Sequence, residues 1–141
     1  MINKKIKSTL LIGSSILMAT STLQANSDGE ALFKSKCMAC HSMSRPTDMN
    51  KIVAPAIMGV MRHIKMTYPN KSEAVVFMKD YVLNPSKEKS LCMPQKLQRF
   101  GVMPSQKGLV TSEELDIILP WIYDTYPPKG FKGMGRKFIQ N

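Results

Sequence analysis

Three side chains with thiol or metal-binding chemistry are gathered in one short run, Cys37-Met38-Ala39-Cys40-His41. This C-x-x-C-H pattern is typical of a site for covalent attachment of haem c. Two thiols three residues apart on one helical turn can add to the two vinyl groups of the porphyrin, and the histidine after the second thiol is then held beneath the iron. The run predicts Cys37 and Cys40 as anchors and His41 as an iron ligand. Because it occurs once, it predicts one haem per chain.

Other chemistry is open to the same residues. A C-x-x-C pair can be a redox-active dithiol or half of a zinc site. A zinc site would need further ligands, and the chain has one other cysteine, Cys92, and one other histidine, His63. A thioredoxin-like dithiol would lie in a βαβ unit, and no such pattern surrounds the motif. His63 could instead be a second iron ligand, although its neighbours Arg62 and Lys65 are typical of a solvated surface.

The N-terminus has the pattern of a secretory signal peptide. Three lysines precede a short apolar stretch at residues 10–19, and Ala25 ends a suitable cleavage site. We therefore predict a signal peptide over residues 1–25 and export to the periplasm; an uncleaved anchor is the alternative. Export agrees with the haem prediction, since c-type haem is attached outside the bacterial cytoplasm. The apolar stretch is too short for an ordinary membrane span, so none is expected in the mature chain.

The mature chain would be distinctly basic. Removal of residues 1–25 takes away three of the 20 basic side chains and none of the 10 acidic ones, which leaves 17 against 10, a formal charge of +7. Such a surplus favours redox protein partners with acidic docking surfaces, although it can serve solubility alone. Nucleic acid is disfavoured as a partner of an exported chain with few aromatic residues.

Helices are predicted on both sides of the motif. Ser27 followed by Glu30 forms a capping-box pattern, so a helix is expected from there into the first cysteine. A second helix is expected from Asn70 or Ser72 to about Leu83, where an Asn-Pro pair ends it.

A last helix is predicted after a long loop. Residues 87–110 have no clear helical period and are expected to form that loop. Thr111 and Glu114 then form a second capping box, and the helix that follows carries an apolar stripe. The stripe consists of Leu115, Ile118, Leu119 and Ile122.

Two further patterns make the chain resemble the class I cytochrome c family. One is the Pro-x-Ile-x-Gly run from Pro55 to Gly59, and the other is Met103-Pro104, shortly before the last predicted helix. The resemblance covers about residues 27–126. It implies an all-α cytochrome c fold, with three to five short helices wrapped around one covalently bound haem. It also implies that the Pro55 carbonyl accepts a hydrogen bond from the ligand histidine and fixes its ring.

The resemblance implies a methionine as the second iron ligand, because the family uses a methionine followed by proline on a loop before the final helix. The chain has two such pairs, Met93-Pro94 and Met103-Pro104. Met103 is 8 positions before Thr111, whereas Met93 is 18 positions before it. A glycine two residues upstream of Met103 also suits a loop that passes close to a cofactor. We therefore predict Met103 as the ligand.

Members of the family cross the last helix over the first. Here the resemblance implies that Trp121 packs on Gly29 and Phe33. Pro120 departs from the family pattern, because proline inside a helix removes one hydrogen bond and should kink the axis at a cost of ~3 kcal/mol.

The chain is thus predicted to divide into a signal peptide (1–25), a cytochrome c domain (26–126) and a basic, glycine-rich C-terminal extension (127–141). An iron closed by His41 and Met103 can change valence without binding substrate, and a methionine ligand raises its potential. The expected function is therefore a periplasmic monohaem electron carrier and not an enzyme. The alternatives are a haem subunit of a periplasmic oxidoreductase, for example of the sulfur-oxidising kind, and a ligand-binding sensor with a labile methionine.

Overall fold

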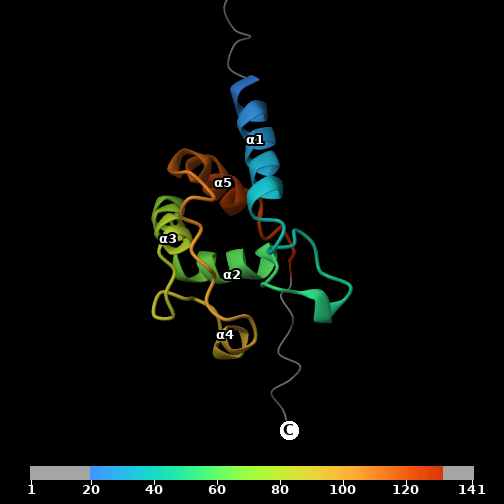
Figure 1. The fold of residues 1–141 in the computed structure, drawn as a ribbon. Coiled ribbons are helices and arrows are strands. Elements are labelled where there is room, and N and C mark those ends of the chain that lie inside the picture. The colour runs from blue at the N-terminus through green and yellow to red at the C-terminus, as the bar shows by residue number, and fades with distance from the viewer. Residues whose placement is uncertain (1–19, 132–141) are drawn as a thin grey trace, which may run out of the picture.

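The chain folds into helices joined by loops (Figure 1). The computed structural model describes residues 20–131, with side chains from residue 27 onward. This range contains five α-helices, one short 3₁₀ helix and no β-strand, so the prediction of an all-α chain is confirmed. The elements are α1 (Thr20–Lys36), η1 (Met49–Lys51), α2 (Ile57–Thr67), α3 (Lys71–Leu83), α4 (Pro94–Phe100) and α5 (Ser112–Thr125).

Helices α1 and α5 cross at close range, as the resemblance implied. Gly29 is buried, and the missing side chain leaves room for Trp121. The Phe33 ring packs against the Trp121 ring with centroids 5.6 Å apart, and Tyr126 meets Trp121 edge-on at 5.8 Å. Aromatic pairs at these separations add about 0.5–1.5 kcal/mol each beyond the area they bury. The crossing therefore belongs to the hydrophobic core, which contains Phe33, Trp121 and Tyr126.

Helix α5 carries the other half of that core. The predicted capping box is present, since Thr111 Oγ1 accepts from the Glu114 N–H at 3.1 Å and Glu114 Oε2 accepts from the Thr111 N–H at 2.8 Å. All four residues of the predicted apolar stripe are buried. The side chains of Ala74 and Met78 on α3 belong to the same cluster, so α5 is packed against both α1 and α3.

Helix α3 agrees with its predicted bounds. The Asn70 side chain accepts from the N–H groups of Ser72 and Glu73 at 2.9 and 3.2 Å, which satisfies two of the donors that a helix start leaves unpaired. The helix ends at Leu83, before the predicted Asn-Pro pair.

The start of α1 was predicted wrongly. The described part of α1 already includes Thr20, so Ser27 lies inside the helix and not at its N-cap. Because the chain continues the helix upstream, the backbone donors that the capping box would satisfy already have helical partners one turn earlier. The Ser27 hydroxyl instead donates to the Asp28 carboxylate at 3.4 Å.

Residues 87–110 are not entirely loop, because α4 lies within them. Pro94 is at the first position of α4, where its missing N–H costs nothing, and Gly101 follows the last residue with a φ of 71°. Helix α4 has no apolar period because it buries none of its residues. Its start and stop signals were therefore the only pattern in the sequence that indicated a helix here. Helix α2 was not predicted either, although its buried Ile57, Met61 and Ile64 follow a helical spacing.

The structure describes only part of the segments predicted at the two ends of the chain. Helix α5 continues through Pro120 and ends at Thr125, before the Pro127-Pro128 pair. The signal peptide predicted over 1–25 overlaps α1 from residue 20, and its earlier part lies outside the described residues, as does 132–141 of the predicted extension. Within the range described, no helix combines the length and apolar character needed to cross a membrane.

The helix crossing can be tested by adding one methyl group. A Cβ at position 29 would lie 2.5 Å from Trp121 Cγ and nearer still to Trp121 Cβ, whereas a Cβ on Gly59 in α2 meets no atom within 4 Å. We expect Gly29→Ala to lower the free energy of unfolding by about 1–3 kcal/mol, because the helices must separate. Gly59→Ala should leave it unchanged or raise it by up to ~1 kcal/mol. Urea denaturation measures both, and equal effects would contradict the close crossing.

Candidate functional site

The C-x-x-C-H run continues the backbone of α1 by one further turn. The Cys37 N–H donates to the Phe33 carbonyl at 2.9 Å, and the N–H groups of Cys40 and His41 donate to the Cys37 carbonyl at 3.2 and 2.9 Å. Both thiols and the imidazole are therefore presented together at the end of α1. This agrees with the predicted placement on one helical turn.

The two thiols of the motif are unlike in their surroundings. Cys37 is half-buried and Cys40 is exposed, and neither is in a disulfide. Burial and, to a smaller extent, the neighbouring Cys40 raise the pKa of the Cys37 thiol to about 11, and Lys36 opposes both. Cys37 is therefore a neutral thiol at pH 7, available for addition chemistry and weak as a thiolate nucleophile.

The His41 ring is held by the backbone of the following loop. Nδ1 lies 2.8 Å from the Pro55 carbonyl oxygen, so the hydrogen bond implied by the resemblance is present. A carbonyl oxygen can only accept, so Nδ1 carries the proton and Nε2 keeps a lone pair available to a metal. Burial lowers the pKa of His41, and the bond to Pro55 opposes this in part. The ring is thus neutral, with its tautomer fixed.

The position of Pro55 follows from the way the loop is closed. The Ile57 N–H at the start of α2 donates to the Ser42 carbonyl at 3.0 Å, which brings the end of the loop back to the residue after His41. A cavity of about 280 Å³ opens beside Cys40, between the motif and this loop.

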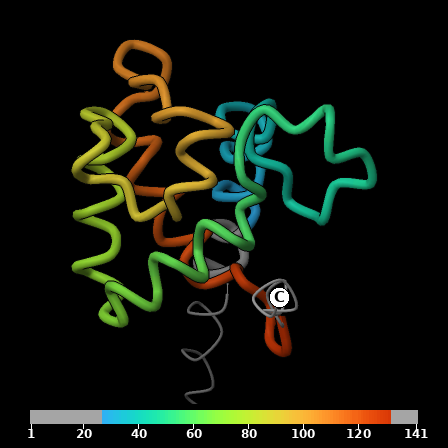
Figure 2. The backbone as a smooth tube through the Cα atoms, turned by 90° about the horizontal axis from the view of Figure 1, so that it is seen from below, coloured from blue at the N-terminus to red at the C-terminus, as the bar shows by residue number. Residues whose placement is uncertain are grey.

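Met103 and Met93 occupy different positions. Met93 is the N-cap residue of α4 and its side chain is 47% exposed. Met103 is half-buried on the loop after α4, two residues beyond Gly101. In Figures 1 and 2 the segment that follows α4 runs between α3 and the end of α1, which bears the motif. Met103 therefore lies on a loop between α4 and α5, and its role as a ligand stays a prediction.

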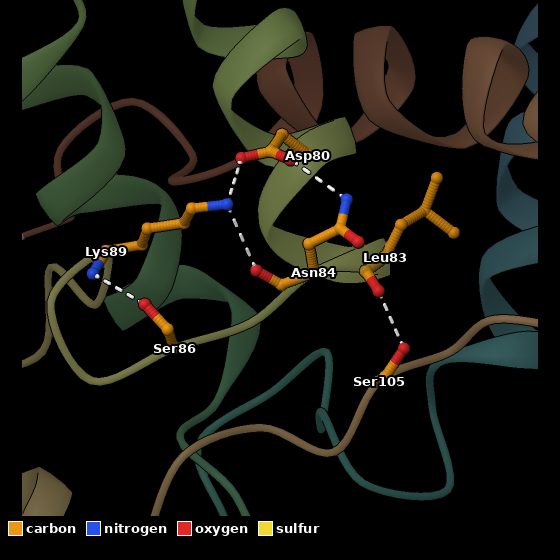
Figure 3. Close-up of polar contacts among 6 residues, drawn as sticks. All are labelled: Asp80, Leu83, Asn84, Ser86, Lys89 and Ser105. Atoms are coloured by element: carbon orange, nitrogen blue, oxygen red, sulfur yellow. Dashed lines mark hydrogen bonds and ion pairs between the residues drawn. The ribbon is translucent and has the colours of Figure 1, made fainter.

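The Met103 loop is fastened to the C-terminal end of α3. The Ser105 hydroxyl donates to the Leu83 carbonyl at 2.6 Å, as Figure 3 shows, and the Gln106 N–H donates to the Val82 carbonyl at 3.0 Å. That end of α3 is itself braced, since Lys89 Nζ bonds Asp80 at 2.6 Å and the Asn84 carbonyl at 3.3 Å.

Three residues that position the site were missed by sequence reasoning. They are Ser105, Lys36, whose Nζ donates to the Leu109 carbonyl at 3.2 Å, and Arg99, whose guanidinium donates to the Met49 carbonyl. Each joins segments far apart in the chain through a backbone carbonyl. Such a bond leaves no motif in the sequence.

The other histidine and the other cysteine of the chain lie on segments outside the C-x-x-C-H turn. His63 lies on α2, partly exposed, one turn before Thr67, whose hydroxyl donates to its carbonyl. Cys92 is a half-buried free thiol before α4. Over the described part of the chain, no group of three or more His, Cys, Asp or Glu side chains is arranged to hold a metal ion.

Comparison with known proteins gives a family but not a function. The chain is 34% identical over 122 residues to an uncharacterized protein of Aquifex aeolicus (strain VF5), and the match covers 77% of this chain and 80% of the Aquifex protein. The chain therefore belongs to the same family as that protein. No family profile and no solved structure matches it.

The thiols of Cys37 and Cys40 in the reduced polypeptide should differ in their rate of alkylation. In a Cys92→Ala background, iodoacetamide should alkylate Cys40 at least about ten times faster than Cys37 at pH 7, because Cys37 is shielded and its raised pKa leaves little thiolate. The rate at Cys37 should rise as pH approaches about 11. Peptide mass spectrometry measures both rates. Equal rates at pH 7 would show that the turn does not bury Cys37.

Proposed function

We propose that this protein is a periplasmic monohaem c-type cytochrome that carries single electrons between redox partners. Cys37 and Cys40 would hold the haem, and His41 and Met103 would be its two iron ligands. The observation that carries the proposal is the histidine of a C-x-x-C-H turn with its Nδ1 bound to the Pro55 carbonyl at 2.8 Å. A histidine that ligates a metal almost always donates its other ring N–H to such an acceptor.

The donor set fits haem c. Both thiols are free, as attachment requires. Each would add its sulfur and its hydrogen across one vinyl double bond, so that a C–S and a C–H bond form, no atom leaves and no oxidant is needed. His41 offers a neutral imidazole whose Nε2 can bind iron. Haem c thus accounts for all three side chains of the motif, whereas zinc would need ligands that this turn does not supply.

When bound, haem would supply an iron that takes up and releases one electron. The chain's own residues would keep that iron closed. Pro55 holds the His41 ring in one orientation and raises its basicity as a ligand. Met103 would be the second protein ligand of that iron, which would leave no ligand site for substrate and would favour a high reduction potential. A closed site of this kind supports a carrier and not an enzyme.

The helix arrangement supports the finer proposal of a cytochrome c fold. The crossing of α1 and α5 at Gly29 and Trp121 is the one implied by the resemblance, and α1 leads directly into the motif. The loop of Met103 is hydrogen-bonded to the end of α3 and enters α5, so each side of the proposed haem site is tied to a helix of the core.

The charge balance supports a partner with an acidic docking surface. Six lysines form ion pairs with carboxylates within the described residues, yet the whole chain has twice as many basic as acidic side chains. Positive charge therefore remains unmatched, and opposite fields speed encounter between redox proteins.

The two Met-Pro pairs provide a matched test. In the haem-loaded protein, Met103→Ala should abolish the sulfur-to-iron charge-transfer band, lower the reduction potential and open the reduced iron to CO. Met93→Ala should leave all three nearly unchanged, since Met93 is exposed at the start of α4. Absorption spectroscopy and potentiometry measure these effects.

Each other result has a definite meaning. The reverse pattern would transfer the ligand to Met93. An unaltered protein that already lacks the band would point to His63 or to an open iron, and would replace the carrier by a sensor or a catalytic subunit. A band that persists in both variants would assign the ligand to another methionine.

A further inference from the structure

The end of α1 is joined to the segment after Met103 by the side chain of Lys36. Its Nζ donates to the Leu109 carbonyl at 3.2 Å and lies 2.9 Å from Glu114 Oε1. The two charged side chains are 33% and 23% exposed, so water screens this pair less than a fully exposed one. Lys36 directly precedes Cys37, so the contact reaches the motif without an intervening residue.

Glu114 shares its carboxylate between two helices. Its Oε2 accepts the Thr111 N–H in the capping box of α5, while its Oε1 pairs with Lys36 at the end of α1. The hydrogen bonds from Thr111 and Lys36 lower the pKa of Glu114, which keeps the carboxylate ionised. One side chain thus fixes both the start of α5 and the position of Lys36.

The segment between Met103 and α5 is therefore held at both ends. Ser105 and Gln106 bind it to α3, and Lys36 binds Leu109 to α1. Between these anchors the N–H groups of Leu109 and Val110 donate to the Gln106 carbonyl at 3.0 and 3.2 Å, which makes a tight turn. Because this turn is short and hydrogen-bonded, a shift of Leu109 should also shift the residues of the Met103 loop.

We propose that Lys36 is a positioning residue that holds the Met103 loop against the motif and so controls how readily Met103 leaves the iron. The inference rests on the proposed function and names a determinant of the same site. Lys36 touches neither ligand, and it acts through the Leu109 carbonyl and Glu114. Without it, the loop would lose the side-chain hydrogen bond that joins it to α1 and keep those that join it to α3.

The test compares Lys36→Met with Lys34→Met in the haem-loaded protein. Lys34 is a matched control, because it forms its ion pair with Glu30 at 2.6 Å within α1. We expect Lys36→Met to increase the fraction of protein that has lost the charge-transfer band, and the rate of CO binding, about five-fold. Lys34→Met should match the unaltered protein in both measurements. Lys36→Arg keeps the positive charge, so both of its values should stay close to those of the unaltered protein.

Hydrogen exchange supplies a readout that does not use the iron. In Lys36→Met the amides of Leu109 and Val110 should exchange faster, while amides inside α3 and α5 keep their rates. Glu114→Gln keeps an acceptor for Thr111 but loses the charge, so it should shift both readouts in the same direction by less. Glu114→Gln therefore replaces Lys36→Met as the test variant if Lys36→Met does not fold.

The outcomes separate the two proposals. An unaltered protein with the charge-transfer band, combined with a Lys36→Met variant identical to it, would overturn the role of Lys36 and leave the proposed function standing. Faster exchange through all helices would make Lys36 a general stabiliser and would equally overturn its positioning role. An unaltered protein without the band would overturn both proposals.

Discussion

Helices α1 and α5 can cross closely because Gly29 has no side chain where Trp121 needs space. That contact sets the direction of α1, and the backbone of α1 continues directly into the turn of Cys37, Cys40 and His41. It also fixes α5, against which α3 packs. Since the loop of Met103 is bound to the end of α3 at one side and enters α5 at the other, both halves of the proposed haem site take their positions from this crossing.

The second constraint is the tautomer of His41. Because the Pro55 carbonyl can only accept, the proton must be on Nδ1, and the lone pair must be on Nε2. Burial keeps the imidazole neutral by lowering its pKa. A ring fixed in orientation and protonation needs little rearrangement when a metal binds or changes valence. This is the property that an electron carrier requires of its ligand.

The helix caps could be predicted from the sequence, because each depends on residues close together in the chain. Asn70 and the Thr111–Glu114 pair cap helices through contacts within three residues, so the sequence carries them in full. The start of α1 could not be read from Ser27, because a capping pattern does not reveal whether upstream residues continue the helix. Helix α4 buries none of its residues and so has no apolar period. In the site, Pro55 and the loop position of Met103 came from motifs, whereas Lys36, Arg99 and Ser105 act on distant carbonyls that leave no pattern.

We propose that the thiols of Cys37 and Cys40 carry one haem, and the intact mass of the exported protein is the sharpest measurement of this attachment. After denaturation and extraction with acid acetone, we expect a polypeptide heavier by the mass of one haem. A Cys37→Ser, Cys40→Ser double variant should lose that added mass. Extraction that removes all colour and leaves the mass of the bare polypeptide would show that neither thiol binds haem covalently.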